Sequence, residues 1–418
     1  MQNNPHQTIK VEYEVDSPSR VIVELDDARL LAIHEPGKGG WGDSLELWGQ
    51  ISQDVGKTWG KPFRFQQSGK PMEGGSSAGC SLVLLADGRL AMCYFVRSDS
   101  AAAGYITRTW YFATSEDDGH TWTEGQQIDI PGGHDISIGK TDQFMFGKVT
   151  QLSSGRIVAP VYWMNSGRHL GMPPTYEDPV KATIQGKLVT RVADGHMFEA
   201  AMGGSYVYHL DSGGDWQRSI GSIAVWPLPS EGIGGFGSTT EPTVIELNDG
   251  RVMMHMRSNV GAIFQSFSED GGHEWGQAEP SGLASGDVPN WLGRIKSTGD
   301  ILTIWNQVSP DEIKRGYSRG RLSIAISTDD AGTWEHHQTV ALSPGLESVE
   351  YIAPPPVQHV RANTDLGVLP DDWARIDYPR LAFVQERVVL IYNYTTYERG
   401  VLKSREMISV VQEKNLYN

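Results

Sequence analysis

The octapeptide SEDDGHTW at residues 115–122 has a close copy, SQDVGKTW, at residues 52–59. Both copies fit the pattern Ser-x-Asp-x-Gly-x-Thr-Trp, in which the Ser and Asp side chains cap backbone N–H groups of a turn. Glycine permits the positive φ that such a turn needs, and the tryptophan is large enough to pack between sheets. The pattern therefore predicts a structural turn that recurs along the chain.

Three weaker copies of this turn follow. Residues 268–275 have Glu274 in place of the threonine, and residues 327–334 have Ala331 in place of the first glycine. A degenerate copy spans residues 209–216. Five copies at intervals along one chain indicate an architecture of repeated units.

A second feature, a strand–turn–strand hairpin, occurs six times and is followed by the octapeptide turn after a few tens of residues. The hairpin turns are expected at residues 26–29, 86–89, 153–156, 248–251, 297–300 and 384–387. Alternating apolar runs joined by Asp-, Asn- or Gly-containing turns are typical of β-hairpins.

The octapeptide turns resemble the Asp-boxes, or BNR repeats, of the sialidase-like β-propellers. With six hairpins, the resemblance implies an all-β fold in which residues 1–418 form a single six-bladed propeller of four-stranded blades. The last blade, about residues 376–412, runs out of chain after three strands. Residues 8–15 are expected to supply its fourth strand and to close the ring.

Composition agrees with an all-β chain and limits its partners. The 418 residues include 48 glycines, 13 tryptophans and 15 tyrosines, which favours many short strands joined by tight turns. The formal net charge of −16 argues against a nucleic-acid partner and an anionic membrane surface. An anionic small substrate is compatible with this charge, because a local group of arginines can override the overall sign.

The sequence shows neither a signal peptide nor an apolar run of about 18 residues that would span a membrane. It predicts a soluble chain that is either cytoplasmic or has lost an export signal, and it leaves the oligomeric state open. Cys80 and Cys93 are expected to be buried free thiols, because no disulfide framework is present. The histidines are scattered and the cysteines lack ligand spacing, so no metal and no other cofactor is expected.

Residues 241–257, EPTVIELNDGRVMMHMR, form the hairpin around which the chemistry is organised. Asn-Asp-Gly between two apolar runs is a strong hairpin signal. Glu241 stands before the first run and Arg257 ends the second, so the hairpin returns both to one sheet edge, about 20 Å or more from the turn. A carboxylate and a guanidinium on one rim suggest a site, although an ordinary hairpin with charged ends has the same pattern.

Other polar residues are expected at the same rim. In a propeller blade, residues just before the first strand, just after the second or just before the third lie near the axis on one face, opposite the Asp-boxes. Six side chains from four blades meet this condition: Arg20, Asp43, Glu241, Arg257, Arg319 and Tyr378. We refer to this face as the top face.

The six residues resemble the site of exo-sialidases, which carry an arginine triad, a Tyr/Glu pair and an Asp. The resemblance implies Arg20, Arg257 and Arg319 as the triad, with Arg321 as the rival for the third place. Three guanidinium groups can bind a substrate carboxylate through charge-assisted hydrogen bonds. The sequence departs from the family at Ser19, where an aromatic residue is usual, and at Ile22, where proline is usual.

The same resemblance implies Tyr378 as nucleophile, Glu241 as its base and Asp43 as acid/base. A neutral phenol avoids the repulsion that a carboxylate nucleophile would meet at an anomeric carbon bearing a carboxylate. Asp43 would protonate the leaving oxygen and then activate water.

The implied function is that of a retaining exo-glycoside hydrolase that removes a terminal sialic acid or related nonulosonic acid from a glycan. One alternative is a propeller glycosidase or lyase that acts on another, uronate-containing glycan. Another is a propeller that binds glycans without catalysis. Two long intervals, residues 164–204 and 341–375, are expected at the top face as walls or lids. The first holds possible contacts to the substrate's tail or aglycone: His169, Tyr176, Glu177 and His196.

Overall fold

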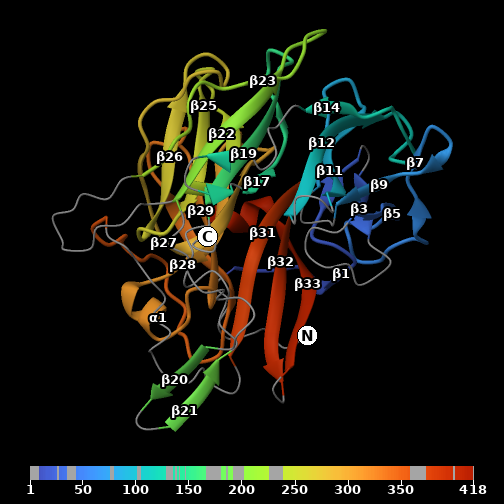
Figure 1. Cartoon of the computed structure of the whole chain (residues 1–418). Coiled ribbons are helices and arrows are strands. Elements are labelled where there is room, and N and C mark those ends of the chain that lie inside the picture. The colour runs from blue at the N-terminus through green and yellow to red at the C-terminus, as the bar shows by residue number, and fades with distance from the viewer. Residues whose placement is uncertain are drawn as a thin grey trace.

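The computed structural model describes residues 9–25, 28–34, 44–75, 80–100, 105–128, 135–136, 139–140, 142–145, 147–165, 180–184, 187–191, 202–225, 239–357, 373–398 and 401–417. Over these ranges the chain is built of β-strands, with one short α-helix, α1 (Pro310–Lys314), and a 3-10 helix at Glu413–Tyr417 (Figure 1). The predicted all-β class is confirmed. No helix in this part of the chain is long and apolar enough to cross a membrane.

Antiparallel sheets of about four strands follow one another through the first half of the chain. The first joins β2 (Ile22–Glu24), β3 (Leu30–His34), β5 (Trp48–Ser52) and β6 (Phe63–Arg64). The second joins β10 (Ser81–Leu84), β11 (Leu90–Ser100), β12 (Tyr105–Ser115) and β14 (Gln126–Ile128). The third joins β17 (Asp142–Met145), β19 (Ile157–Asn165), β22 (Met202–Leu210) and β23 (Gln217–Arg218), and β18 (Thr150–Gln151) also pairs with β19.

Seven strands form one continuous path in the next part of the chain. They are β24 (Thr239–Glu246), β25 (Val252–Ser258), β26 (Ala262–Ser268), β27 (Glu279–Arg294), β28 (Ile301–Gln307), β29 (Arg321–Ser327) and β30 (Glu335–Leu342). The long strand β27 pairs with β26 through its first part and with β28 through its second, and its register breaks between Ser285 and Asn290. One strand therefore belongs to two consecutive ladders.

The last sheet combines both ends of the described chain. Its order is β1 (Tyr13–Ser17), β33 (Val401–Gln412), β32 (Arg387–Glu398) and β31 (Ala374–Val384). The strand β1 is antiparallel to β33, and it occupies residues 13–17, whereas the sequence suggested residues 8–15. The difference arises because Ile9 donates its N–H to the Thr339 carbonyl of β30 and packs in the neighbouring cluster.

Short ladders contain the remaining strands of the described residues. They are β4 (Ser44–Glu46) with β9 (Glu73–Gly75), β13 (Thr121–Trp122) with β7 (Gln66–Gln67) and β8 (Lys70–Pro71), β15 (Asp135–Ile136) with β16 (Gly139–Lys140), and β20 (Val180–Ile184) with β21 (Lys187–Arg191). The β20–β21 hairpin lies at the edge of the molecule, apart from the large sheets (Figure 1).

The predicted octapeptide turns are present and are held as their chemistry requires. In residues 115–122, the Ser115 hydroxyl accepts from Gly119 N (3.0 Å), and the Asp117 carboxylate accepts from both the backbone and the hydroxyl of Thr121 (2.7 Å each). Burial alone would raise the pKa of Asp117, but these hydrogen bonds outweigh it and lower the pKa. The Trp122 indole donates to Gly119 O at 2.8 Å and packs on Phe65 of the preceding sheet.

The first strands of successive sheets lie next to one another. The strand β2 contacts β10 and β31, while β27 contacts β24 and β31. The Ser81 hydroxyl of β10 accepts from Val149 N (2.9 Å), and Thr150 Oγ1 of β18 donates to Val244 O of β24 (3.4 Å). These contacts run from β2 through β10, β18, β24, β27 and β31 back to β2, although within the described residues no single sheet closes on itself.

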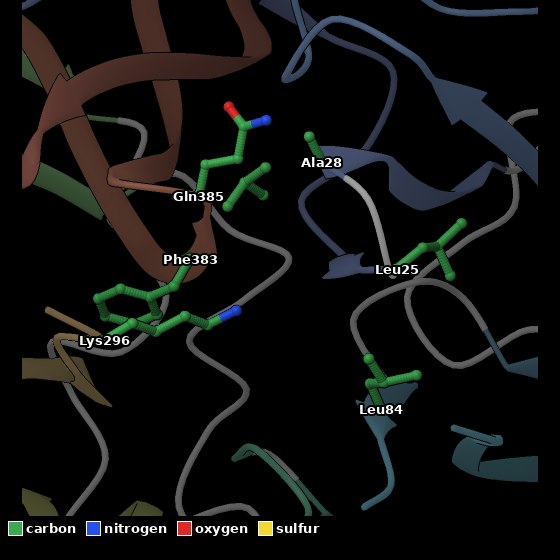
Figure 2. Close-up of a pocket in the computed structure, with 7 residues that line it drawn as sticks. Leu25, Ala28, Leu84, Lys296, Phe383 and Gln385 are labelled. Atoms are coloured by element: carbon green, nitrogen blue, oxygen red, sulfur yellow. The ribbon is translucent and has the colours of Figure 1, made fainter. Parts of the chain in front are cut away.

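These first strands have two distinct ends. At the turn end, a hollow of about 540 Å³ lies between Leu25, Ala28 and Leu84 on one side and Lys296, Phe383 and Gln385 on the other (Figure 2). Its one cationic group, Lys296, is paired with Glu24 at 3.0 Å. Tyr378 lies near the middle of the strand that carries Phe383. The hollow is therefore displaced along these strands from the predicted site.

Cys80 and Cys93 are both buried free thiols, as expected. They pack into different apolar clusters, because Cys93 stands opposite Ser81 in the ladder and Cys80 precedes that residue. Burial raises the pKa of Cys93 above its ordinary range. Such thiols fill space in the core and are poor nucleophiles.

Candidate active site

The hairpin of β24 and β25 brings Glu241 and Arg257 together, as the sequence predicted. Arg257 Nη1 lies 2.7 Å from Glu241 Oε2, and each side chain is only 6% exposed. Arg257 stands opposite Thr240 in the ladder, so Glu241 lies within β24 near its start instead of just before it. A buried carboxylate–guanidinium pair near the end of a hairpin is the first element of the candidate site.

A β-bulge aims the Glu241 side chain. The register of β24 breaks between Thr240 and Thr243, and Glu241 has a φ of 46°. Tyr378 has the same features, with a φ of 52° and a register break between Asp377 and Arg380. Left-handed backbone at a non-glycine residue is costly, and such residues gather at functional sites.

Tyr378 is partly buried and lies against two of the three proposed arginines. The guanidinium carbons of Arg319 and Arg20 are 5.3 and 5.5 Å from the centre of its ring. Burial and the negative charge of Glu241 raise the pKa of Tyr378, and the charges of Arg319 and Arg257 only partly offset this rise. The resting site thus holds a neutral phenol under the electrostatic influence of the Glu241 carboxylate.

The two candidates for the third arginine have different surroundings. Arg319 donates from Nη1 to Asp377 Oδ2 at 2.7 Å and faces the Tyr378 ring. Arg321 is turned to the segment around α1, where it contacts Glu312 and the Glu347 carbonyl. The structure therefore brings Arg319 to Tyr378 and holds Arg321 elsewhere.

Each proposed arginine is accompanied by a carboxylate. Arg20 Nε lies 3.8 Å from Glu406 Oε1, and Arg257 Nε lies 2.8 Å from Asp287 Oδ1. Asp377, which holds Arg319, is fully buried, accepts a hydrogen bond from Asn393 and forms an ion pair with Arg375. Burial raises the pKa of Glu406, and the charge of Arg20 only partly opposes this. The arginine cluster is therefore close to charge balance.

Asp287, Asp377 and Glu406 were not identified in the sequence analysis. Asp377 directly precedes the predicted nucleophile in the sequence, and this adjacency is the one signal that could have pointed to it. Asp287 lies in the middle of the long strand β27, where the strand passes from its ladder with β26 to its ladder with β28, and no sequence pattern marks that transition. Glu406 lies within β33, opposite Ser17 of β1 and Asn393 of β32, and only this pairing places it beside Arg20.

A fourth arginine, Arg380, lies behind the site. Its guanidinium carbon is 5.0 Å from the Trp291 ring centre. Burial and the charge of Arg20 lower the pKa of Arg380 to about 9, although Glu406 opposes them. Arg380 therefore interacts electrostatically with both Arg20 and Glu406.

Some predicted residues cannot be placed. Asp43 lies outside the described residues, as do His169, Tyr176, Glu177 and His196 of the first long interval. In the second interval, residues 343–357 are described and residues 358–372 are not. Across the described ranges, no group of three or more His, Cys, Asp or Glu side chains is placed to hold a metal ion.

The site combines a neutral phenol, a carboxylate that acts on it electrostatically, and arginines paired with acids. A family model described as a BNR repeat-like domain matches residues 28–388, and the chain belongs to that family. The predicted resemblance to the sialidase superfamily is thereby confirmed. No curated protein matches the sequence.

Solved structures share the fold over nearly the whole chain. A protein of unknown function from Dyadobacter fermentans DSM 18053 is 14% identical, with a TM-score of 0.59 and coverage of 97% of this chain and 99% of that one. Trypanosoma rangeli sialidase in complex with the inhibitor DANA is 13% identical, with a TM-score of 0.54 and coverage of 96% of this chain and 56% of that one. The K499G mutant of NanB sialidase from Streptococcus pneumoniae is 12% identical, with a TM-score of 0.54 and coverage of 99% and 71%.

Proposed function

We propose that the protein is a retaining exo-glycoside hydrolase that removes a terminal sialic acid or related nonulosonic acid from glycans. The observation that carries the proposal is the placement of Tyr378 between Arg20 and Arg319, under the electrostatic influence of Glu241. A partly buried phenol with a base and cations beside it is the arrangement that a tyrosine nucleophile needs. Two of the structurally similar proteins are named as sialidases.

In the proposed first step, Tyr378 Oη attacks the anomeric carbon while Glu241 takes the phenolic proton. The bond from the anomeric carbon to the leaving oxygen breaks, and Asp43 protonates that oxygen. In the second step, Asp43 removes a proton from water and the water oxygen attacks the same carbon. The bond from that carbon to Tyr378 Oη breaks, and Glu241 returns its proton to the tyrosine. Two displacements at one carbon retain the anomeric configuration.

Arg20, Arg257 and Arg319 are proposed to bind the substrate's carboxylate. A guanidinium already paired with a carboxylate can still donate from its remaining N–H groups, since each arginine has five. The pairing holds each planar group in place before substrate arrives, which reduces the entropy lost on binding. The substrate's carboxylate must nevertheless compete with Glu406, Glu241, Asp287 and Asp377 for these donors.

The scaffold is proposed to be a single six-bladed propeller spanning residues 1–418. The succession of contacts from β2 through β31 and back to β2 supports a ring of first strands around one axis. A cavity of about 50 Å³ between β2, β10 and β31 is consistent with such an axis. The strand β1, paired with β33, would complete the sixth blade.

The direct test is a panel of fluorogenic α-glycosides of sialic acid, its deaminated form, other nonulosonic acids and uronic acids. We expect release of fluorophore from a nonulosonic acid glycoside, with retention at the anomeric carbon by NMR. Inversion would contradict the tyrosine mechanism. An unsaturated product that absorbs in the ultraviolet would identify a lyase, and binding without turnover of any glycoside would identify a glycan-binding protein.

A further inference from the structure

A third strand carries the same irregularity as the strands of Glu241 and Tyr378. Asp287 in β27 has a φ of 46°, and the register of β27 with β28 breaks around it, between Ser285 and Asn290. In all three strands a proline follows the left-handed residue by one or two positions: Pro242, Pro289 and Pro379. The strand β27 contacts both β24 and β31. The same backbone irregularity thus occurs in three strands that lie close together, two of which carry the proposed chemistry.

The carboxylate of Asp287 stands between a buried guanidinium and solvent. Its Oδ1 lies 2.8 Å from Arg257 Nε, and its side chain is 29% exposed, whereas Arg257 and Glu241 are each 6% exposed. The contact to Arg257 through Oδ1 leaves Asp287 the more accessible of the two acids on this arginine. An incoming anion would therefore meet Asp287 before it met Glu241.

Both forks of Arg257 already have one nitrogen in contact with an acid. A carboxylate binds arginine in a bidentate manner through Nε with Nη2, or through Nη1 with Nη2. Asp287 engages Nε, and Glu241 engages Nη1. Nε carries a single N–H, which Asp287 engages, so a substrate carboxylate can take the fork of Nε and Nη2 only when Asp287 yields that donor. At the fork of Nη1 and Nη2 it shares Nη1 with Glu241, and at either fork it meets the repulsion of both acids.

We propose that Asp287 is a specificity-determining residue, which competes with the substrate's carboxylate for Arg257 and so limits the preference of the site for anionic over neutral sugars. The inference rests on the proposed function, because it assumes that Arg257 meets a carboxylate. Asp287 would then oppose anion binding from a left-handed residue at a register break, the same backbone feature that Glu241 and Tyr378 have.

The test compares two inhibitors in one assay. The first is the 2,3-didehydro derivative of the acidic sugar that the protein hydrolyses best, and the second is its neutral carboxamide. The ratio of the two inhibition constants measures the preference for the anion and does not depend on the active fraction of a preparation. For Asp287→Asn we expect the preference for the acid to rise about tenfold or more, since a like charge in contact with the ligand's carboxylate is removed. Asp287→Ala should shift it in the same direction.

Asp249→Asn provides a matched control. Asp249 Oδ2 lies 2.7 Å from Arg251 Nε, but this pair is exposed in the turn of the β24–β25 hairpin, away from the site. The ratio of the two inhibition constants for Asp249→Asn should equal that of the unaltered protein. The proposed competition would be overturned if the preference of Asp287→Asn for the acid stayed within about twofold of that of the unaltered protein, or fell. Complete loss of turnover in both folded Asp287 variants would overturn it as well. No hydrolysis of any acidic glycoside by the unaltered protein would refute the proposed function itself.

Discussion

Arg257 shows what a single side chain contributes to this site. It is buried, and it holds two carboxylates through two different nitrogens, Nη1 for Glu241 and Nε for Asp287. Burial alone would lower the pKa of Arg257, but Asp287 and Glu241 outweigh burial and keep the pKa above its ordinary value. Only a planar, branched cation can serve both acids and still offer a donor to a ligand.

Replacing Arg257 by lysine should therefore cost more than one hydrogen bond. Lysine keeps the charge, but it has a single nitrogen and cannot rebuild the fork. We expect kcat/KM on the best acidic glycoside to fall, because the activation free energy should rise by about 2–4 kcal/mol. Arg251→Lys, in the exposed pair with Asp249, is the control and should have no effect. A fall of less than about twofold in Arg257→Lys would remove this arginine from the site.

Tyr378 makes a prediction about pH. Because burial and Glu241 raise its pKa, the phenol is neutral in the resting site at and above neutral pH, and Glu241 must take its proton as attack occurs. Activity between pH 7 and pH 9 should then not climb with the phenolate fraction, which would rise about tenfold per pH unit below the pKa. A kcat/KM profile that climbs tenfold per unit over this range would show attack by a preformed phenolate.

At the scale of one element, the octapeptide turns were predictable because their contacts are local. Within a single turn, Ser52 accepts a hydrogen bond from the Gly56 N–H, and Asp54 accepts from the N–H and hydroxyl of Thr58. The sequence pattern specifies each of these residue types. The β24–β25 hairpin was equally readable from Asn-Asp-Gly. The bulges at Glu241, Asp287 and Tyr378 could not be predicted, since a register break depends on how two whole strands pair.

The Asp117 carboxylate allows this local account to be tested. Asp117→Ala removes the bonds to Thr121 and to Ser115, and we expect the free energy of unfolding at pH 7 to fall by about 1–3 kcal/mol. Since the folded-state pKa of Asp117 is lowered, its contribution is present above the unfolded pKa and is lost as pH falls through the folded pKa. The difference from the unaltered protein should therefore shrink near pH 3.

Urea unfolding at both pH values measures this effect. Glu116→Ala, an exposed neighbour in the same turn, is the control and should change stability by less than about 0.5 kcal/mol. Equal losses for the two variants, or a loss for Asp117→Ala that is independent of pH, would contradict the role given to the Asp117 carboxylate.

At the scale of the whole molecule, the site is assembled from sheets that are distant in sequence. Arg20 precedes β2, Glu241 lies in β24, Arg319 precedes β29, and Tyr378 lies in β31. The topology of repeated hairpins was enough to expect these four together. It was not enough to find Glu406 or Asp377, because their partners depend on cross-strand pairing in the last sheet and on the approach of Arg319 to it.

The pairing of β1 with β33 makes a prediction at this scale. Removal of residues 1–17 would expose the edge of β33 and delete the contacts of Ile9 and Tyr13, so the melting temperature should fall by several degrees or more. Removal of residues 1–8 alone, which leaves β1 in place, should change it little. Equal melting temperatures for the long deletion and the intact chain would show that β1 does not stabilise the last sheet.

The central claim is that Tyr378 is a covalent nucleophile, and a mechanism-based label tests it most directly. A 2,3-difluorinated sialic acid forms the glycosyl–enzyme bond quickly and loses it slowly, so digestion and mass spectrometry can locate the sugar. We predict one labelled peptide with the adduct on Tyr378, and no adduct in Tyr378→Phe, whose kcat should be lower by several orders of magnitude. An adduct on any other residue, or an undiminished adduct in Tyr378→Phe, would contradict the account.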